Sequence, residues 1–167
     1  CGGSAYAYKC VANRHQVAFK DPAVIASEVS SVIPYLRGPI FFLGDIVMGG
    51  RDHFSRIMDA LRPLKIRSEV LLEFFSPPSR DILEELASTF PKFNIEISPE
   101  SPDLAVRKAF GRPFDNASLE RFIKDSDEVG CRRLDLFFMT GIPRQTYEAT
   151  VGTVDYCRDL LSSIRGK

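Results

Sequence analysis

The stretch that decides the fold spans residues 111–146 and reads GRPFDNASLERFIKDSDEVGCRRLDLFFMTGIPRQT. Leu119 and Phe122 belong to an apolar face with helical spacing, and Gly130 stands where a left-handed residue ends a helix. The mostly apolar run 134–139 follows and predicts a strand covered on both faces. A helix that leads into such a strand is the repeating unit of a parallel β/α protein.

The same unit recurs along the rest of the chain. Three further apolar or alternating runs predict strands at 39–43, 69–75 and 93–98. The helices around them are marked by Asp21 with Pro22, Phe54 to Leu61, Ser79 with Ile82 to Phe90, Ser101 with Leu104 and Val106, and Tyr147, Val151, Val154 and Leu161. This alternation predicts parallel strands joined by right-handed crossovers. An open doubly wound sheet and an arc of a β/α barrel both fit the pattern.

The composition is that of one globular domain. The chain has 167 residues, and its 22 basic and 22 acidic residues cancel. A neutral balance argues against nucleic acid or an anionic membrane surface as the partner, and no apolar run reaches the length of a membrane span. The four cysteines show neither the spacing of a zinc site nor a disulfide framework, and Cys131 and Cys157 fit small apolar positions on or beside helices.

Polar and turn-forming residues follow every predicted strand. They are Gly44 and Asp45, then Ser76 and Pro77, then residues 98–101, and finally residues 140–143. Each group has a structural explanation of its own, as a helix cap or a turn. Because the carboxyl ends of parallel strands carry the functional edge of both architectures, four such ends together indicate a binding site.

Carboxylates also stand inside the predicted strands. Glu73 and Glu96 are at mid-strand, and Asp135 is near the start of its strand. Glu96 shares one strand face with Asn94 and Ser98, which predicts either a ligand-lined interior or an edge strand that faces water. We expect Glu73 and Glu96 to lie on the face that the helices leave open.

Four segments together resemble the radical S-adenosylmethionine superfamily. They are CGGS at 1–4, FFLGD at 41–45, ISPESPDLAVRKAFGR at 97–112 and RLDLFFMTGIPRQT at 133–146. The chain looks most like the branch of iron–sulfur oxidoreductases that is often joined to a cobalamin-binding domain. The resemblance covers essentially the whole chain. It implies an α/β fold in which parallel β/α repeats form an incomplete arc of a TIM-like partial barrel.

The resemblance also implies cofactors. Members of the family hold a [4Fe-4S] cluster through three cysteines and bind S-adenosylmethionine at its open iron; cobalamin is a further option in this branch. Cys1 matches the third cluster cysteine. We therefore expect residues 1–167 to be a single, truncated radical SAM core that lacks the first strand, the first two cluster cysteines and the last strand or strands, and that holds no cluster by itself.

Site residues carry over position by position from the family. Gly44 and Asp45 match the motif that meets the methionine amino group, although Asp replaces Glu and one Gly is missing. Ser98, Glu100 and Ser101 match the region that approaches the ribose and the methionine. Arg112 matches an arginine near the carboxylate, and Gly141 and Ile142 match the wall near the adenine. Glu73 and Glu96 are candidates for a substrate cavity.

The implied function is that of a cytoplasmic iron–sulfur oxidoreductase or radical transferase acting on a substrate that the sequence does not identify. The family cleaves S-adenosylmethionine reductively and uses the 5′-deoxyadenosyl radical to abstract hydrogen. The alternatives are a catalytically inactive binding module of the same fold and a flavodoxin-like regulatory or scaffolding domain. We expect no nucleic-acid or membrane partner. The exposed edges of an incomplete sheet would favour a homo-oligomer.

Overall fold

The computed structural model describes residues 6–15 and 17–165. Its strands are β1 (Ile40–Phe42), β2 (Val70–Phe74), β3 (Phe93–Glu100) and β4 (Leu134–Phe138). Its α-helices are α1 (Pro22–Val32), α2 (Arg51–Leu61), α3 (Arg80–Thr89), α4 (Leu104–Ala109), α5 (Asn116–Glu128) and α6 (Tyr147–Arg165). Three short helical turns complete the description: η1 (Ala7–Val11), η2 (Ile33–Tyr35) and η3 (Arg62–Leu64). The predicted alternation of helices and strands is confirmed, and η1 is an addition that the sequence did not suggest.

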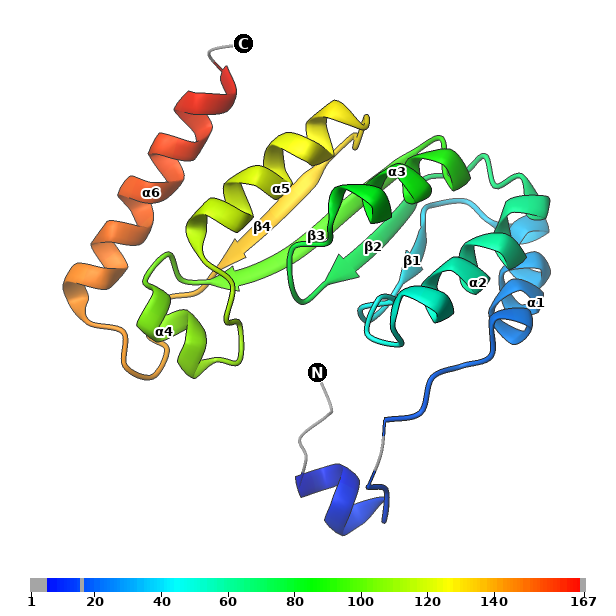
Figure 1. The fold of residues 1–167 in the computed structure, drawn as a ribbon, viewed down its shortest axis with the longest axis horizontal. Helices are drawn as coiled ribbons and strands as arrows, with labels where there is room; N and C mark the ends of the chain where they lie inside the picture. Colours follow the sequence, from blue (N-terminus) through cyan, green and yellow to red (C-terminus); the bar gives the residue numbers. More distant parts are fainter. Residues whose placement is uncertain (1–5, 16, 166–167) are drawn as a thin grey trace.

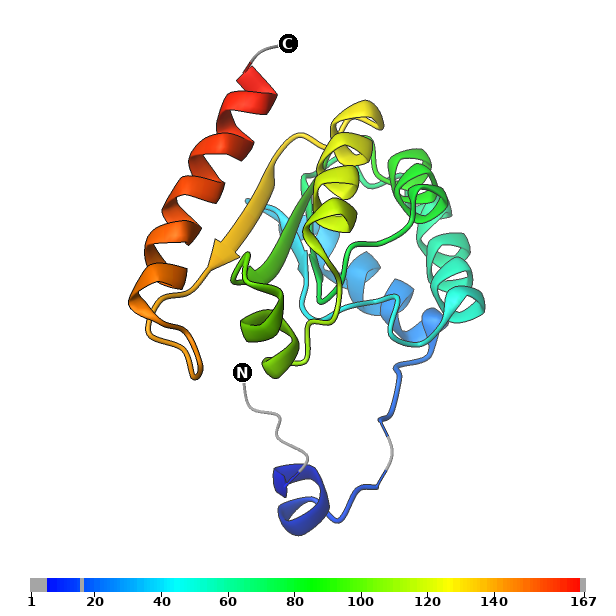
Figure 2. The same ribbon diagram turned by 60° about the vertical axis from the view of Figure 1, so that its left-hand side comes forward.

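The four strands form one parallel sheet in the order β1-β2-β3-β4. Helices α2, α3 and α5 cover one face of this sheet, while α4 sits at its carboxyl end and α6 lies beyond β4 (Figures 1 and 2). A doubly wound sheet would carry helices on both faces and reverse its strand order near the middle. The sheet is therefore an arc of parallel β/α repeats, and the flavodoxin-like alternative is wrong.

The hydrophobic core lies between the sheet and these three helices. Leu72 and Ile95 are fully buried on the sheet side, and Phe54, Leu86 and Leu119 are fully buried on the helix side. Burying one such side chain contributes about 1.5–3 kcal/mol. Because strand side chains alternate between the two faces, the residues between these core positions point to the face without helices.

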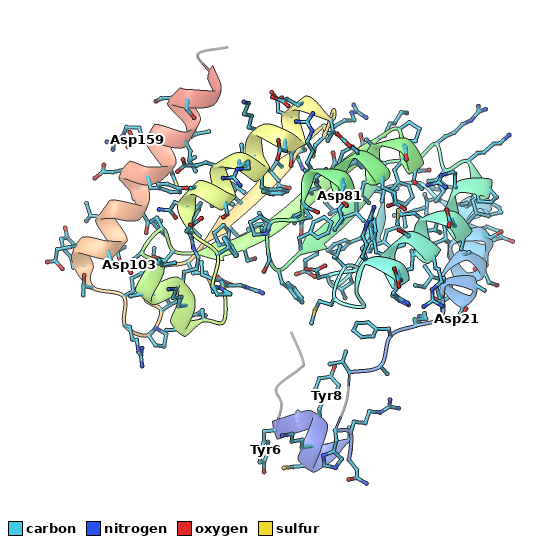
Figure 3. The ribbon with its side chains drawn as sticks, in the orientation of Figure 1. Tyr6, Tyr8, Asp21, Asp81, Asp103 and Asp159 are labelled. Carbon is cyan, nitrogen blue, oxygen red and sulfur yellow. The ribbon has the colours of Figure 1, made fainter. Side chains whose placement is uncertain are left out.

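Aspartates begin three of the helices. Asp21 Oδ1 accepts a hydrogen bond from the Ala23 N–H at 2.8 Å, just before Pro22 at the first helical position. Asp103 does the same for α4 (Figure 3), and Asp115 does so for α5. The start at Asp21 was predicted. At α4 the prediction was wrong, because Ser101 precedes the cap and its Oγ accepts from the Asp103 N–H.

Two further expectations need correction, and one of the two alternatives for Glu96 is excluded. The third strand runs on through Pro99 to Glu100 and shifts register between Ile97 and Glu100, so its end is longer than the predicted 93–98. Ser79 precedes α3 as predicted, but its hydroxyl donates to Asp81 Oδ1 and caps no backbone N–H. β3 is an inner strand, paired on both sides, so Glu96 does not lie on an edge strand.

The last helix is present, but its inward face differs from the predicted one. The predicted apolar positions Val151, Val154 and Leu161 are exposed by 42%, 57% and 54%. Thr153 is buried instead, and Tyr156 packs edge-on against Phe138 with ring centroids 6.0 Å apart. The inward face carries the hydroxyl-bearing Thr153 and Tyr156, so apolar spacing along this helix predicted the wrong face.

Candidate functional site

The carboxyl ends of the four strands are joined by one chain of polar contacts. Asp45, after β1, accepts hydrogen bonds from the N–H groups of Val47 and Phe75, both at 2.9 Å. The first contact stays within its own loop and the second reaches the end of β2. Burial raises the pKa of Asp45, and the two backbone donors partly offset that rise.

Glu73 connects the same two strands from inside the sheet. Its Oε2 accepts a hydrogen bond of 2.9 Å from the Gly44 N–H. Gly44 has φ of +89°, a left-handed conformation that favours glycine, and nothing lies within 4 Å of the position a Cβ would take. The Gly44 backbone therefore faces open space on the carboxyl edge.

Arg112 joins β2 to β3. One of its terminal nitrogens donates to the Phe75 carbonyl at 3.3 Å, and its guanidinium lies over the Phe75 ring, 4.7 Å from the centroid. Its Nε is buried without a hydrogen-bond partner among the described residues, since Glu100 Oε1 is 3.9 Å away. A buried donor without an acceptor is costly, so this atom is suited to an acceptor from outside the chain.

Glu100 has an unusual position at the end of β3. Its side chain is only 9% exposed, and its φ of +67° is left-handed although it is not glycine. Burial raises the pKa of the Glu100 carboxyl, and the nearby Arg112 charge lowers it. The Glu100 carbonyl accepts from the Met139 N–H at 2.9 Å, which ties β3 to the end of β4.

The loop after β4 is held by Gln145. Its side-chain oxygen accepts from the Gly141 N–H at 2.8 Å and lies 3.4 Å from the Ile142 nitrogen, while its amide donates to the Met139 carbonyl at 3.1 Å. Gly141 has φ of +74° and open space where a Cβ would stand. The Gly-Ile-Pro-Arg-Gln-Thr sequence that follows β4 thus forms a loop that presents its backbone to the carboxyl edge.

A buried arginine supports this edge from behind. Arg107, on α4, is fully buried and donates to the carbonyls of Ser101 and Phe114 and to Asn116 Oδ1, at 2.8, 3.0 and 2.7 Å. Asn116 in turn donates to the Pro102 carbonyl at 3.2 Å. These bonds fix the loop between α4 and α5, which carries Arg112. In the sequence Arg107 reads as an ordinary helix-surface residue, so it was missed.

The predicted residues of the strand ends therefore lie at one edge. The contacts described above link five of them there: Gly44, Asp45, Glu100, Arg112 and Gly141. Ser98 lies two residues before Glu100 in β3. Ser101 is fully buried in the loop that leads into α4, and Ile142 follows Gly141. The joint placement at the carboxyl edge agrees with the expectation.

The cysteines are distributed differently. Cys1 lies outside the described residues. Cys10 is exposed on η1, Cys131 lies between α5 and β4 at the amino end of the sheet, and Cys157 lies in α6. Burial raises the pKa of Cys131 to about 11, which disfavours its thiolate. The part of the chain that the structure describes brings together no three His, Cys, Asp or Glu residues able to hold a metal ion.

The fit to the implied cofactors is therefore uneven. The orphaned Arg112 Nε and the open backbones at Gly44 and Gly141 suit a ligand that carries a carboxylate and N–H groups, as S-adenosylmethionine does. The described cysteines do not suit an iron–sulfur cluster, which needs converging thiolates. No helix among the described residues is long and apolar enough to cross a bilayer.

Comparison with known proteins finds a similar architecture among solved structures. The chain matches no family model and no curated protein sequence. Its fold is similar to that of coproporphyrinogen III oxidase (HemN) from Escherichia coli, a radical SAM enzyme, with a TM-score of 0.62 and 18% identity. The match covers 89% of this chain and 37% of that one. At this identity the likeness establishes a shared β/α arc, and the chain spans little more than a third of the neighbour.

Proposed function

We propose that this chain is the S-adenosylmethionine-binding part of a radical SAM oxidoreductase. The observation that carries the proposal is the buried Arg112 Nε, which has no hydrogen-bond acceptor among the described residues. It lies on a carboxyl edge where Gly44 and Gly141 leave backbone open, in a fold similar to that of a radical SAM enzyme. Such an edge is where parallel β/α proteins bind ligands.

Different residues would bind different groups of S-adenosylmethionine. Arg112 would donate to the methionine carboxylate, because a guanidinium pairs well with a carboxylate. Asp45 and Glu100 would accept from the amino group and the ribose hydroxyls, with Ser98 and Ser101 nearby. Gly141 and Ile142 would line the adenine. Glu73 would hold the Gly44 backbone in place through its 2.9 Å contact.

Held by Arg112, Asp45, Glu100 and Gly141, S-adenosylmethionine would supply radical chemistry: one-electron reductive cleavage of its sulfur–C5′ bond would release methionine and allow hydrogen abstraction from a substrate. The electron would come from an iron–sulfur cluster whose ligands are not among the described residues. In the proposal Cys1 is one of these ligands, and the others belong to a longer parent protein that lies in the cytoplasm. The proposal also includes cobalamin as a possible further cofactor and a homo-oligomer formed through the exposed sheet edges.

A second candidate is a binding module of the same fold without radical chemistry. The separation of Cys10, Cys131 and Cys157 favours it, since these cysteines offer no cluster site. The two functions differ in one product, 5′-deoxyadenosine.

The test uses the protein expressed from its complete reading frame. It is reconstituted anaerobically with iron and sulfide, reduced with dithionite and supplied with S-adenosylmethionine; methionine and 5′-deoxyadenosine are then measured by mass spectrometry. We expect equal amounts of both, and a KM for S-adenosylmethionine about tenfold higher in Arg112→Met, as the loss of one charge-assisted hydrogen bond gives. Arg121→Met, an exposed change on α5, is the matched control.

If the protein binds S-adenosylmethionine but forms no 5′-deoxyadenosine, the first candidate is refuted and the binding module is retained. Absence of binding, or an equal effect of the two arginine variants, would refute both candidates.

A further inference from the structure

Three carboxylates stand in one row on the sheet face without helices. Glu73 of β2 pairs in register with Glu96 of β3, and Glu96 pairs in register with Asp135 of β4. Neighbouring strands lie about 4.8 Å apart, so the three side chains leave the sheet side by side. Each is partly buried. Like charges in such a row repel one another, and a fold keeps them at a cost unless something of opposite charge is near.

The outer carboxylates have partners and the middle one has none. Glu73 accepts from the Gly44 N–H at 2.9 Å, and Asp135 lies 2.9 Å from Arg133 Nε. No described residue forms a hydrogen bond or a close ion pair with Glu96; the charges near it are those of Asp135, Glu73 and Arg133. Glu96 therefore has free acceptor capacity on a half-buried surface.

Asn94 is a second, independent sign of a ligand at this place. It lies two residues before Glu96 on the same strand face, between Leu71 of β2 and the chain before β4. Its exposed fraction is only 5%, and its side-chain amide makes no hydrogen bond to the described residues. Neither the amide nitrogen nor the amide oxygen of Asn94 is fully buried, so the small accessible area of this residue includes its amide. The amide is therefore open to a polar group that binds beside Glu96.

The geometry favours an organic cation over a metal ion. Three carboxylates on parallel strands rise side by side and do not converge within about 2.5 Å of one point, as Ca²⁺ or Mg²⁺ requires. The described residues accordingly form no group able to hold a metal. A guanidinium or an ammonium has N–H groups that point in several directions and can bridge acceptors about one strand spacing apart.

We propose that the row Glu73–Glu96–Asp135, with Asn94 beside it, binds a guanidinium or ammonium group of the substrate, and that Glu96 is its main acceptor. The row lies on the open face of the sheet, next to its carboxyl edge. A cationic small molecule bound there would therefore be held near the adenosyl site. Only the assignment of this cation to a substrate rests on the proposed function; the binding itself does not.

The test is a titration of the isotope-labelled chain followed by NMR, with no cluster and no S-adenosylmethionine present. The probes are butylguanidine, butylamine and butylurea, the last a neutral molecule of nearly the same shape as the first. We expect millimolar binding of one or both cations, reported by the side-chain carboxyl signals of Glu96 and the side-chain amide of Asn94, and none of butylurea. The two cationic probes distinguish a guanidinium site from an amine site.

Two variants of equal charge change decide the location. Glu96→Gln should weaken cation binding by about tenfold or more, because one charge-assisted hydrogen bond is lost. Glu84→Gln, on the outer surface of α3 with a side chain 57% exposed, should bind like the unchanged chain. Circular dichroism checks that both variants fold, which we expect because Glu96→Gln relieves repulsion.

Binding of butylurea as tight as that of butylguanidine, no signal change at Glu96 and Asn94, or equal weakening by Glu96→Gln and Glu84→Gln would each overturn the inference. Its failure is distinguishable from that of the proposed function, because the cation titration needs neither cofactor. A parent protein that forms 5′-deoxyadenosine while the row binds no cation would retain the function and lose the inference, and the reverse result would do the opposite.

Discussion

Replacing Arg107 by methionine should destabilise the fold more than any surface change on α4. Methionine fills a similar volume but donates no hydrogen bond. The carbonyls of Ser101 and Phe114 and the Asn116 side-chain oxygen would lose donors at 2.8, 3.0 and 2.7 Å. Leaving a buried acceptor unsatisfied costs about 1–3 kcal/mol.

The three losses are not fully additive, and the variant no longer buries a charge, which Asp115 offsets only in part. The methionine side chain also retains apolar burial. We therefore expect the free energy of unfolding to fall by about 3 kcal/mol, close to the lower limit for breaking a buried charged group's contacts. For a chain of this size that corresponds to a Tm lower by roughly 6–12 °C.

Urea denaturation followed by circular dichroism measures this change, with the m-value expected to stay constant. Lys108→Met is the matched control, since Lys108 is the next residue on the same helix and is exposed; its effect should stay within about 0.5 kcal/mol. Arg107→Lys should lie between the two. If Arg107→Met lowered stability by no more than Lys108→Met, the three hydrogen bonds would not hold the α4–α5 loop in the way argued above.

Three other changes test single features of the site. Glu96→Gln should raise stability near neutral pH and have little effect in acid. Burial and the neighbouring charges of Asp135 and Glu73 raise the pKa of Glu96 above 4.5, while Arg133 opposes the rise. The folded state therefore binds a proton more tightly than the unfolded state, and the stability of the unchanged chain falls as pH rises through the raised pKa. Urea titrations at several pH values would contradict this if the stability difference between Glu96→Gln and the unchanged chain did not vary with pH. Gly44→Ala should cost about 1–2 kcal/mol, since φ is +89° and no neighbour obstructs the Cβ, while Gly38→Ala, equally open and without a left-handed φ, should cost little in the same thermal melts. Gln145→Ala should speed hydrogen exchange of the Gly141 amide by roughly fivefold, the loss of one hydrogen bond of about 1 kcal/mol, with the Thr150 amide inside α6 as the internal reference; an unchanged rate at Gly141 would mean that Gln145 does not hold the loop.

The repeat of helices and strands could be predicted because it depends on local patterns. Asp21 with Pro22 begins a helix and Gly130 ends one, each through its own backbone preference. The apolar runs of the four strands are nearly continuous. The grouping of Asp45, Glu100 and Gly141 at one edge followed from parallel strands alone.

Register and burial could not be predicted in the same way. The row of Glu73, Glu96 and Asp135 depends on which residues of adjacent strands pair, and three sequence-distant segments set that alignment. Arg107 looks like its exposed neighbour Lys108 in the sequence; only the packing of α4 against the 111–116 loop makes it buried. Apolar spacing in α6 favoured the face of Val151 and Val154, whereas the face that meets the sheet carries Thr153 and Tyr156, whose contact with Phe138 exists only in the folded chain.

The order of the strands in space is the order in which they occur in the chain. Each strand pairs only with the one made before it and the one made after it, so a nascent chain leaving the ribosome can add each unit to an edge that is already finished. No early strand has to wait unpaired for a distant partner, and contacts close over short separations, which favours rapid co-translational folding. An arc with this strand order can also gain or lose a terminal β/α unit in evolution without any change in the connections of the remaining units, as a solenoid can.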